Sequence, residues 1–418
     1  MVATRGTRGG FEAFWAIALL ALMAATFRLW LPGSWTGTGD FPMVPLCDLG
    51  SVGLGQQAIR LVSTATTFAI VIACLVIAGR CQLRWMWPIV AVSLAVSVLL
   101  DQHRLQPWVY QSFLYAVLFT LAPRSESGQS TEATFRLIRL LTISVYVFSA
   151  AGKFDFQFLH TVGQDFLRAP LQWFGVDVSA WSVRTRLFAA ASFPAFELCV
   201  AVALSCPRTR RLGVWMATAM HLGLLVVLSP LGLGHSPGVM VWNVGMAIQA
   251  WWLFAGPAPS ADQVADPESR SVGWLAWAVV AMAWVMPVFE RSGYWDHWMA
   301  WALYSPHSSR VSMQVHESAI DQLPKAWQVA VSEDDDSDRW HDLRLGSLSL
   351  AIRGVPVVPQ ARYQWALANR LIQQSQIERQ VRGKVQSVSD RWTGERSEKW
   401  WTRPDEFQAA GEAFWLVP

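Results

Sequence analysis

Charged residues are distributed very unevenly along this chain of 418 residues. Residues 290–418 hold 17 of the 30 acidic and 15 of the 33 basic side chains, which leaves 31 charges for the other 289 residues. Charged residues make up only 15% of the chain, against about 25% in soluble domains. The distribution predicts a membrane-embedded part, residues 1–289, followed by a C-terminal extramembrane domain, residues 290–418.

Apolar runs close to the length that crosses a bilayer, about 20 residues, recur throughout the first part. We place nine of them near residues 12–31, 59–79, 85–100, 107–122, 135–152, 186–205, 212–229, 238–255 and 272–289. The first run follows Arg5 and Arg8 but lacks a small-residue cleavage site, so we interpret it as an uncleaved helix. The fold class predicted is an all-α polytopic membrane helical bundle of about nine transmembrane helices, with eight or ten as alternatives.

Arginine and lysine are retained in cytoplasmic loops, so their distribution predicts the orientation of the bundle. With the N-terminus in the cytoplasm, eleven basic residues fall in inside segments and seven in outside segments. The loop 206–211, with three arginines, is the strongest single indication. We therefore expect an integral membrane protein of the bacterial inner-membrane or plasma-membrane type, with its C-terminal domain outside.

The C-terminal domain is predicted to be a small α+β structure. Strand-like runs occur at 311–315, 328–331, 348–352 and 381–388. Residues 360–376 have apolar side chains near 3.6-residue spacing and are predicted to be a helix.

Charge and cysteine content exclude several functional classes. A net charge of +3 without a basic run gives no indication of a nucleic-acid partner. The five cysteines form no C-x-x-C pair and no zinc-like spacing with histidine, so no metal site is expected. The lipid bilayer is the partner that the composition indicates.

Polar side chains inside the apolar runs are the most informative residues, because a charge at the bilayer centre is unfavourable by about 2.5–3.5 kcal/mol. Glu197, His221 and Asn243 interrupt three runs, and Lys153 ends the fifth. One interpretation is a polar cavity in the outer half of the bundle, where Lys153, Glu197 and His221 converge and Lys153 acts as a neutral-amine base. The alternative is that Glu197 pairs with His221 or an arginine between helices, while Lys153 extends to the headgroups.

The stretch Tyr146-Val-Phe-Ser-Ala-Ala-Gly-Lys153-Phe-Asp155 resembles the segment of vitamin K-dependent γ-carboxylases in which Ala-Gly precedes a catalytic lysine. It is also similar to the wider HTTM membrane family. The order of features continues to match: a helix with Glu197, a basic turn at 208–211, and a helix with His221 before a glycine-rich loop. The run Gln106-Pro-Trp-Val-Tyr110 occupies the place of the family's Asn-His-x-x-x-Tyr run. The similarity covers about residues 10–255.

This resemblance implies that Lys153 is the base that starts the oxygenation of a reduced quinone, with Glu197 and His221 in the catalytic site. Gln106 and Tyr110 of the matching run, together with Asn243 of the eighth apolar run, are predicted to bind the cofactor. Two departures stand out: Gln106-Pro107 replaces the family's Asn-His pair, and the large lumenal region is reduced to a short tail. They favour a related reaction on a quinone or lipid, or an inactive relative, over protein carboxylation.

Two hypotheses of different classes remain open. The first is a carboxylase-like membrane enzyme that binds a quinone or lipid-like cofactor in an outward-facing cavity. The second is a non-catalytic membrane protein that anchors its C-terminal domain or presents it to a protein partner. A transporter ranks last, because paired Gly/Pro-broken helices are missing from the sequence.

Overall fold

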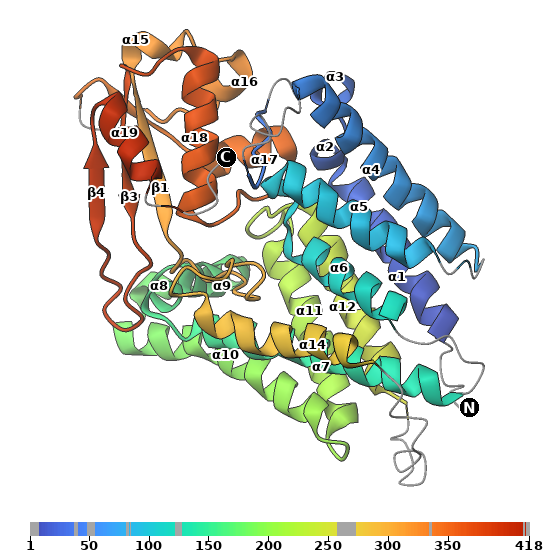
Figure 1. The fold of residues 1–418 in the computed structure, drawn as a ribbon. Helices are drawn as coiled ribbons and strands as arrows, with labels where there is room; N and C mark the ends of the chain where they lie inside the picture. The colour runs from blue at the N-terminus through green and yellow to red at the C-terminus, as the bar shows by residue number, and fades with distance from the viewer. Residues whose placement is uncertain are drawn as a thin grey trace. The chain divides into compact units, whose positions relative to one another are not determined.

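The computed structural model describes residues 8–36, 41–47, 55–80, 83, 85–121, 128–256, 273–333, 337–412 and 414. Most of them are helical, and a small antiparallel sheet lies in the C-terminal part (Figure 1). Contacts divide the chain into two compact units. Unit 1 comprises Met1–Ala25, Ala69–Ser93 and Pro107–Pro306, and unit 2 comprises Thr26–Phe68, Leu94–Gln106 and His307–Pro418.

These units differ from a simple division at residue 290. Residues 290–306 cluster with unit 1, whereas Thr26–Phe68 and Leu94–Gln106 cluster with His307–Pro418. The boundary at residue 290 separates the predicted membrane-embedded part from the predicted extramembrane domain. This division by solvent stays a prediction. Within unit 2, however, residues on both sides of that boundary fold together.

Each of the nine apolar segments contains a helix. The nine helices are α1 (Arg8–Ala25), α4 (Gln56–Ala78), α5 (Met86–Leu100), α6 (Pro107–Leu121), α7 (Gly128–Lys153), α10 (Val183–Ser205), α11 (Arg210–Leu228), α12 (Pro237–Phe254) and α14 (Trp274–Val285). Five have the length and hydropathy to cross a membrane: α1, α10, α11, Gln57–Ala78 of α4 and Glu132–Lys153 of α7. Helices α5 and α14 are apolar but shorter. Membrane-length helices are therefore present, while the count of nine spans is not confirmed.

Short helices and turns connect the long helices of unit 1. Helix α8 (Phe156–His160) begins after Asp155, whose carboxylate accepts a hydrogen bond from the Gln157 N–H at 2.8 Å. This cap separates α8 from α7. Helix α10 begins in the same way, because Ser182 Oγ accepts from the Thr185 N–H. The other connecting elements are α9 (Val162–Leu171), η2 (Gln172–Phe174), η3 (Val178–Ala180) and η5 (Met286–Phe289).

The backbones of α10 and α11 lie close together at Gly213. A Cβ atom placed there would lie 2.8 Å from the backbone nitrogen of Leu204 and 2.9 Å from the carbonyl carbon of Ala203. We expect Gly213→Ala to lower the free energy of unfolding by about 1–3 kcal/mol, because two backbones must separate. Gly223→Ala, on the same helix with nothing within 4 Å, is the control and should be neutral or stabilising by up to about 1 kcal/mol. Thermal unfolding of both variants in detergent tests this, and equal losses would contradict it.

Unit 2 contains a four-stranded antiparallel sheet in the order β2-β1-β3-β4. The strands are β1 (Arg310–His316), β2 (Trp340–Leu343), β3 (Val381–Gln386) and β4 (Glu398–Trp401). Val311 of β1 pairs with Val385 of β3, and Met313 of β1 pairs with Leu343 of β2. Alternate β1 residues are buried, as expected for a strand with one covered face, and α18 packs on that strand (Figure 1). The predicted small α+β structure is therefore present.

Not every predicted element of this unit is correct. The strands at 311–315 and 381–388 and the helix at 360–376 are confirmed, the last as α18 (Ala361–Ser375). The strand predicted at 348–352 is wrong, because these residues lie in helix α17 (Leu345–Arg353), which buries Leu345, Leu348 and Ile352 at helical spacing. At 328–331 only Val331 makes a bridge. The remaining helices are α2 (Phe27–Trp30), α3 (Gly33–Thr36), η1 (Gln102–Arg104), α15 (Glu317–Ile320), α16 (Lys325–Gln328) and α19 (Pro404–Gly411).

Candidate functional site

Three polar side chains lie on one face of α7. Tyr146, Ser149 and Lys153 are spaced at i, i+3 and i+7, which aligns them along the helix. All three are buried. The face is therefore a polar stripe inside an apolar unit, and each of its members has a hydrogen-bond partner.

Lys153 forms the central contact of this stripe. Its Nζ lies 2.6 Å from Glu197 Oε2, on α10, and donates to Ser149 Oγ at 2.6 Å. The side chains are only 7% and 11% exposed, so both charges lie inside the unit. The structure thus brings Lys153 and Glu197 together as a buried ion pair. This contact belongs to the first interpretation, whereas the alternative pairs Glu197 with His221 or an arginine.

His221 lies in a second hydrogen-bonded chain. Asn243 Nδ2 donates to the Val239 carbonyl at 2.9 Å, so its Oδ1 is free to accept from His221 Nδ1, also at 2.9 Å. That leaves His221 Nε2 as an acceptor for the Tyr146 hydroxyl, at 2.9 Å. The chain fixes His221 as the Nδ1–H tautomer. His221 thus contacts the same face of α7 as Glu197 does, through Tyr146 rather than through Lys153.

Residues 301–305 pack close to the Lys153 end of α7. A Cβ atom on Gly152 would lie 2.9 Å from Ser305 Oγ. Tyr304 packs edge-on against Phe166, with ring centroids 5.3 Å apart, and its pKa is raised by burial and by the charge of Glu197. Trp301 and Tyr304 both adopt positive φ, near 58° and 57°, which is unusual for side chains of this size. Aromatic groups therefore lie next to the ion pair.

Each of the three predicted cofactor residues makes contacts of its own within the chain. Gln106 belongs to unit 2, where its amide donates to the His103 carbonyl at 3.0 Å. Asn243 holds His221, as described above. Tyr110 is buried, with its ring centroid 5.0 Å from that of Trp301, and its hydroxyl has no partner among the residues that the structure describes.

Tyr110 and Tyr115, both on α6, allow a matched test of whether the Tyr110 hydroxyl lacks a hydrogen-bond partner. The Tyr115 hydroxyl bonds to Thr142 and Gln111, both at 3.1 Å. We expect Tyr115→Phe to lower the free energy of unfolding by about 1–3 kcal/mol, because buried partners lose a hydrogen bond. Tyr110→Phe should cause no loss. A loss of equal size in Tyr110→Phe, measured by thermal unfolding, would contradict the observation and indicate a bound partner for that hydroxyl.

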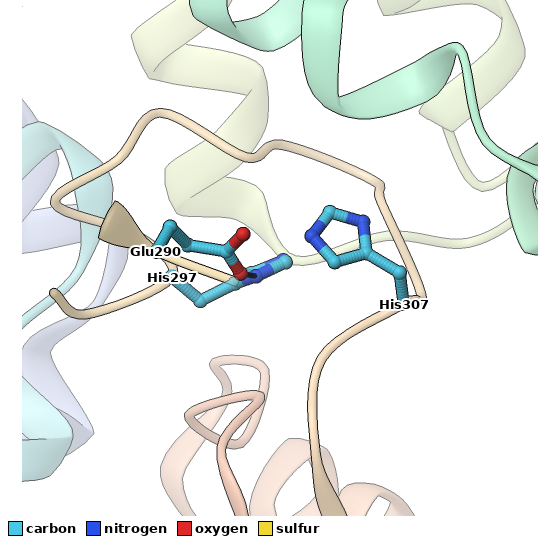
Figure 2. A group of neighbouring side chains, drawn as sticks. All are labelled: Glu290, His297 and His307. Atoms are coloured by element: carbon cyan, nitrogen blue, oxygen red, sulfur yellow. Dashed lines mark hydrogen bonds and ion pairs between the residues drawn. The ribbon is translucent and has the colours of Figure 1, made fainter. Parts of the chain in front are cut away.

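Several polar residues of unit 1 were not singled out from the sequence. Ser149 and Tyr146 could have been found by their helical spacing from Lys153. Asp155 pairs with Arg291, and His297 Nδ1 lies 2.6 Å from Glu290 Oε1 (Figure 2). Figure 2 also draws His307, which belongs to unit 2. The local sequence pattern indicates neither pair, because in each pair the two residues lie in different stretches of the chain with turns between them.

Two shallow cavities stand out, and both lie within unit 2. One, of about 150 Å³, is lined by residues including Trp401 and Phe407. The other, of about 220 Å³, is lined by residues including Arg344 and Gln364. Lys153 lines neither cavity, so the outward-facing cavity expected around it stays a prediction.

Comparison with known proteins found no family model, curated protein or solved structure that matches the chain. What the protein does is therefore inferred from the side chains of the site.

Proposed function

We propose that this chain is an integral membrane protein whose helical unit carries an acid–base site formed by Lys153 and Glu197. The observation that carries the proposal is the buried ion pair, with 2.6 Å between Nζ and Oε2, on helices long and apolar enough to span a membrane. Ionisable side chains in such helices are unfavourable and are functional by default. We propose the nine-span, HTTM-like arrangement over residues 10–255, with a cytoplasmic N-terminus and the C-terminal domain outside.

The pair can act as a base because two buried charges are unfavourable in a medium of low dielectric constant. Transfer of one proton from Lys153 to Glu197 leaves a neutral amine beside a neutral acid. The Lys153 amine can then accept a proton from a ligand hydroxyl, which leaves an oxyanion next to the new ammonium group. Ser149 positions Nζ through its 2.6 Å hydrogen bond and does not itself exchange the proton.

A ligand with an aromatic hydroxyl fits these residues, and the resemblance to the carboxylases makes a reduced quinone the class proposed. The Phe166 ring packs edge-on against the rings of Phe193 and Tyr304, and the charge of Glu197 acts on Tyr304, so we propose that a flat ring packs against this aromatic group. When bound, a reduced quinone would supply an acidic hydroxyl. Lys153 would accept the proton of that hydroxyl and then, as an ammonium group, balance the charge of the oxyanion, while Glu197 holds the proton first taken from Lys153.

The test uses the full chain in lipid nanodiscs and reduced menadione as the probe. Lys153→Arg retains the positive charge opposite Glu197 but cannot become a neutral base. We expect the wild-type chain to bind the probe with the absorbance spectrum of its phenolate. The Lys153→Arg variant should bind within about threefold of the wild-type affinity but show the neutral spectrum. Lys384→Arg, in the sheet of unit 2, is the control. An unchanged phenolate spectrum in Lys153→Arg would show that Lys153 is not the base.

The non-catalytic alternative has one observation in its favour. Lys153, Glu197, His221 and Asn243 all have hydrogen-bond partners within the chain, as interhelical contacts in a purely structural bundle would. Such a protein would bind no menadione in its wild-type form and would capture a specific protein through unit 2. Crosslinking should use the full chain, because residues 26–68 and 94–106 belong to the same unit as 307–418.

A further inference from the structure

Unit 2 contains a buried group of charged side chains apart from the Lys153 site. Arg353, at the end of α17, pairs with Asp101, which precedes η1, and Arg104 lies at the end of η1. Their exposed fractions are 7%, 0% and 3%. Two guanidinium groups and only one carboxylate of this group thus lie in the interior of the unit, and the carboxylate pairs with Arg353.

Backbone carbonyls take up several of the guanidinium hydrogens. Arg104 donates from Nε to the Leu29 carbonyl at 3.2 Å and from Nη2 to the Trp30 carbonyl at 3.3 Å. Arg353 Nη1 donates to the carbonyls of Arg28 and Leu29. These are C-terminal carbonyls of the short helix α2, which have no partner within the helix. The two arginines therefore cap α2, but carbonyls bring no full negative charge.

The neighbouring titratable groups do not supply the missing charge. Burial and the charge of Arg353 lower the pKa of His103 to about 4, so His103 is neutral at physiological pH. Burial raises the pKa of Tyr363 well above its usual value, which keeps its hydroxyl protonated. Arg104, Arg353 and Asp101 then leave one uncompensated positive charge among the described residues of the group. A buried charge without a counter-ion is strongly unfavourable.

Three hydrogen-bond donors of the group also lack an acceptor. Arg104 Nη1, Arg353 Nε and the Tyr363 hydroxyl have no hydrogen-bond partner in the part of the chain that the structure describes. The Tyr363 ring lies 5.5 Å from that of His103, so it belongs to the same group. The fourth buried atom without a partner, His103 Nδ1, is an acceptor: Ser349 Oγ donates to Val355, which makes His103 Nε2 the protonated nitrogen.

We propose that unit 2 binds one small inorganic anion of halide size, chloride in the cell, between Arg104, Arg353 and Tyr363. An anion would balance the positive charge left among the described residues, which a water molecule alone would not, and the three donors are its ligands. The dense burial of all three side chains favours a monoatomic ion over a phosphate group or a lipid headgroup. Such an ion would hold α2, η1 and α17 together, and this role does not depend on the Lys153 site.

Bromide, which scatters anomalously, is the direct probe. Crystals of the full chain grown in sodium bromide should show an anomalous peak within hydrogen-bonding distance of Arg104 and Arg353. Ordered water or phosphate-shaped density without that peak would overturn the proposal. A peak in the crystal supports the proposal only if the solution measurement agrees. Binding at crystal concentration only would also overturn the proposal.

In solution, chloride should raise the melting temperature of the full chain in a saturable way. Sodium gluconate at equal ionic strength should not. Arg104→Gln should abolish the chloride response, whereas Arg382→Gln should retain it, because Arg382 lies on β3 and pairs with Asp338. If Arg104→Gln does not fold, Tyr363→Phe is used instead, because it removes one ligand without altering the charge. The chloride concentration that gives half of the maximal stabilisation should then rise at least threefold. Equal chloride responses in the wild type and Tyr363→Phe would contradict the assigned ligands.

Discussion

Replacing Lys153 by Met is expected to lower the free energy of unfolding by about 3–5 kcal/mol. The substitution removes the partner of Glu197 and leaves its carboxylate buried, with 11% of the side chain exposed. Glu197→Gln should have a similar effect, because it leaves the Lys153 ammonium without its counter charge. Reversible thermal or denaturant unfolding in a mild detergent, followed by circular dichroism, measures the loss.

The double variant separates a buried ion pair from two independent contributions. Lys153→Met combined with Glu197→Met removes both charges and should recover most of the loss, because well-packed apolar side chains can replace a buried pair. Lys384→Met is the matched control, because Lys384 pairs with Glu398 at 2.9 Å on the sheet surface and its loss should change stability little. If the double variant is as unstable as the sum of the single variants, the two side chains are not coupled.

The long apolar helices could be predicted from the sequence because their signal is local. A long run of apolar residues predicts a helix, and each of the nine predicted segments contains one. Residues 348–352 show the limit of this reasoning. Five mostly apolar residues fit a strand as well as a helix. The helical burial of Leu345, Leu348 and Ile352 becomes evident only from the tertiary structure.

The candidate site was predictable in part for the same reason. Lys153 and Glu197 are conspicuous because charges are rare in apolar runs, and an ion pair between neighbouring helices is the simplest way to bury both. The contacts of the Gln106 side chain were not predictable from the sequence. Its amide also approaches the carbonyl of Pro356, 250 positions away in the sequence. Local spacing carries no information about such a partner.

The boundary near residue 290 illustrates a related limit. Charge density separates segments by their expected solvent, whereas folding units are defined by which residues pack together. Arg353 and Asp101 are 252 positions apart and form one buried pair within unit 2. Composition places one of them in the membrane part and the other in the extramembrane domain. Only the contacts show that both belong to a single unit.

Asp101→Asn is expected to have a comparably large effect in unit 2, about 3–5 kcal/mol of lost stability. The change retains the size of the side chain but removes the carboxylate that pairs with Arg353, and among the described residues of the group it leaves two buried guanidinium groups and no anionic side chain.

Unfolding of the full chain should show this loss, and Arg353→Met in the same chain should restore part of it by removing one of the two positive charges. Asp338→Asn is the control, because its partner Arg382 lies on the sheet and is 27% exposed, so water can solvate the arginine. If a halide occupies the group, the Asp101→Asn variant should also gain more stability from chloride than the wild type does, because the ion becomes the only anionic partner of both arginines. A variant that unfolds like the wild type in every salt would show that the carboxylate contributes no more than a neutral hydrogen-bond acceptor.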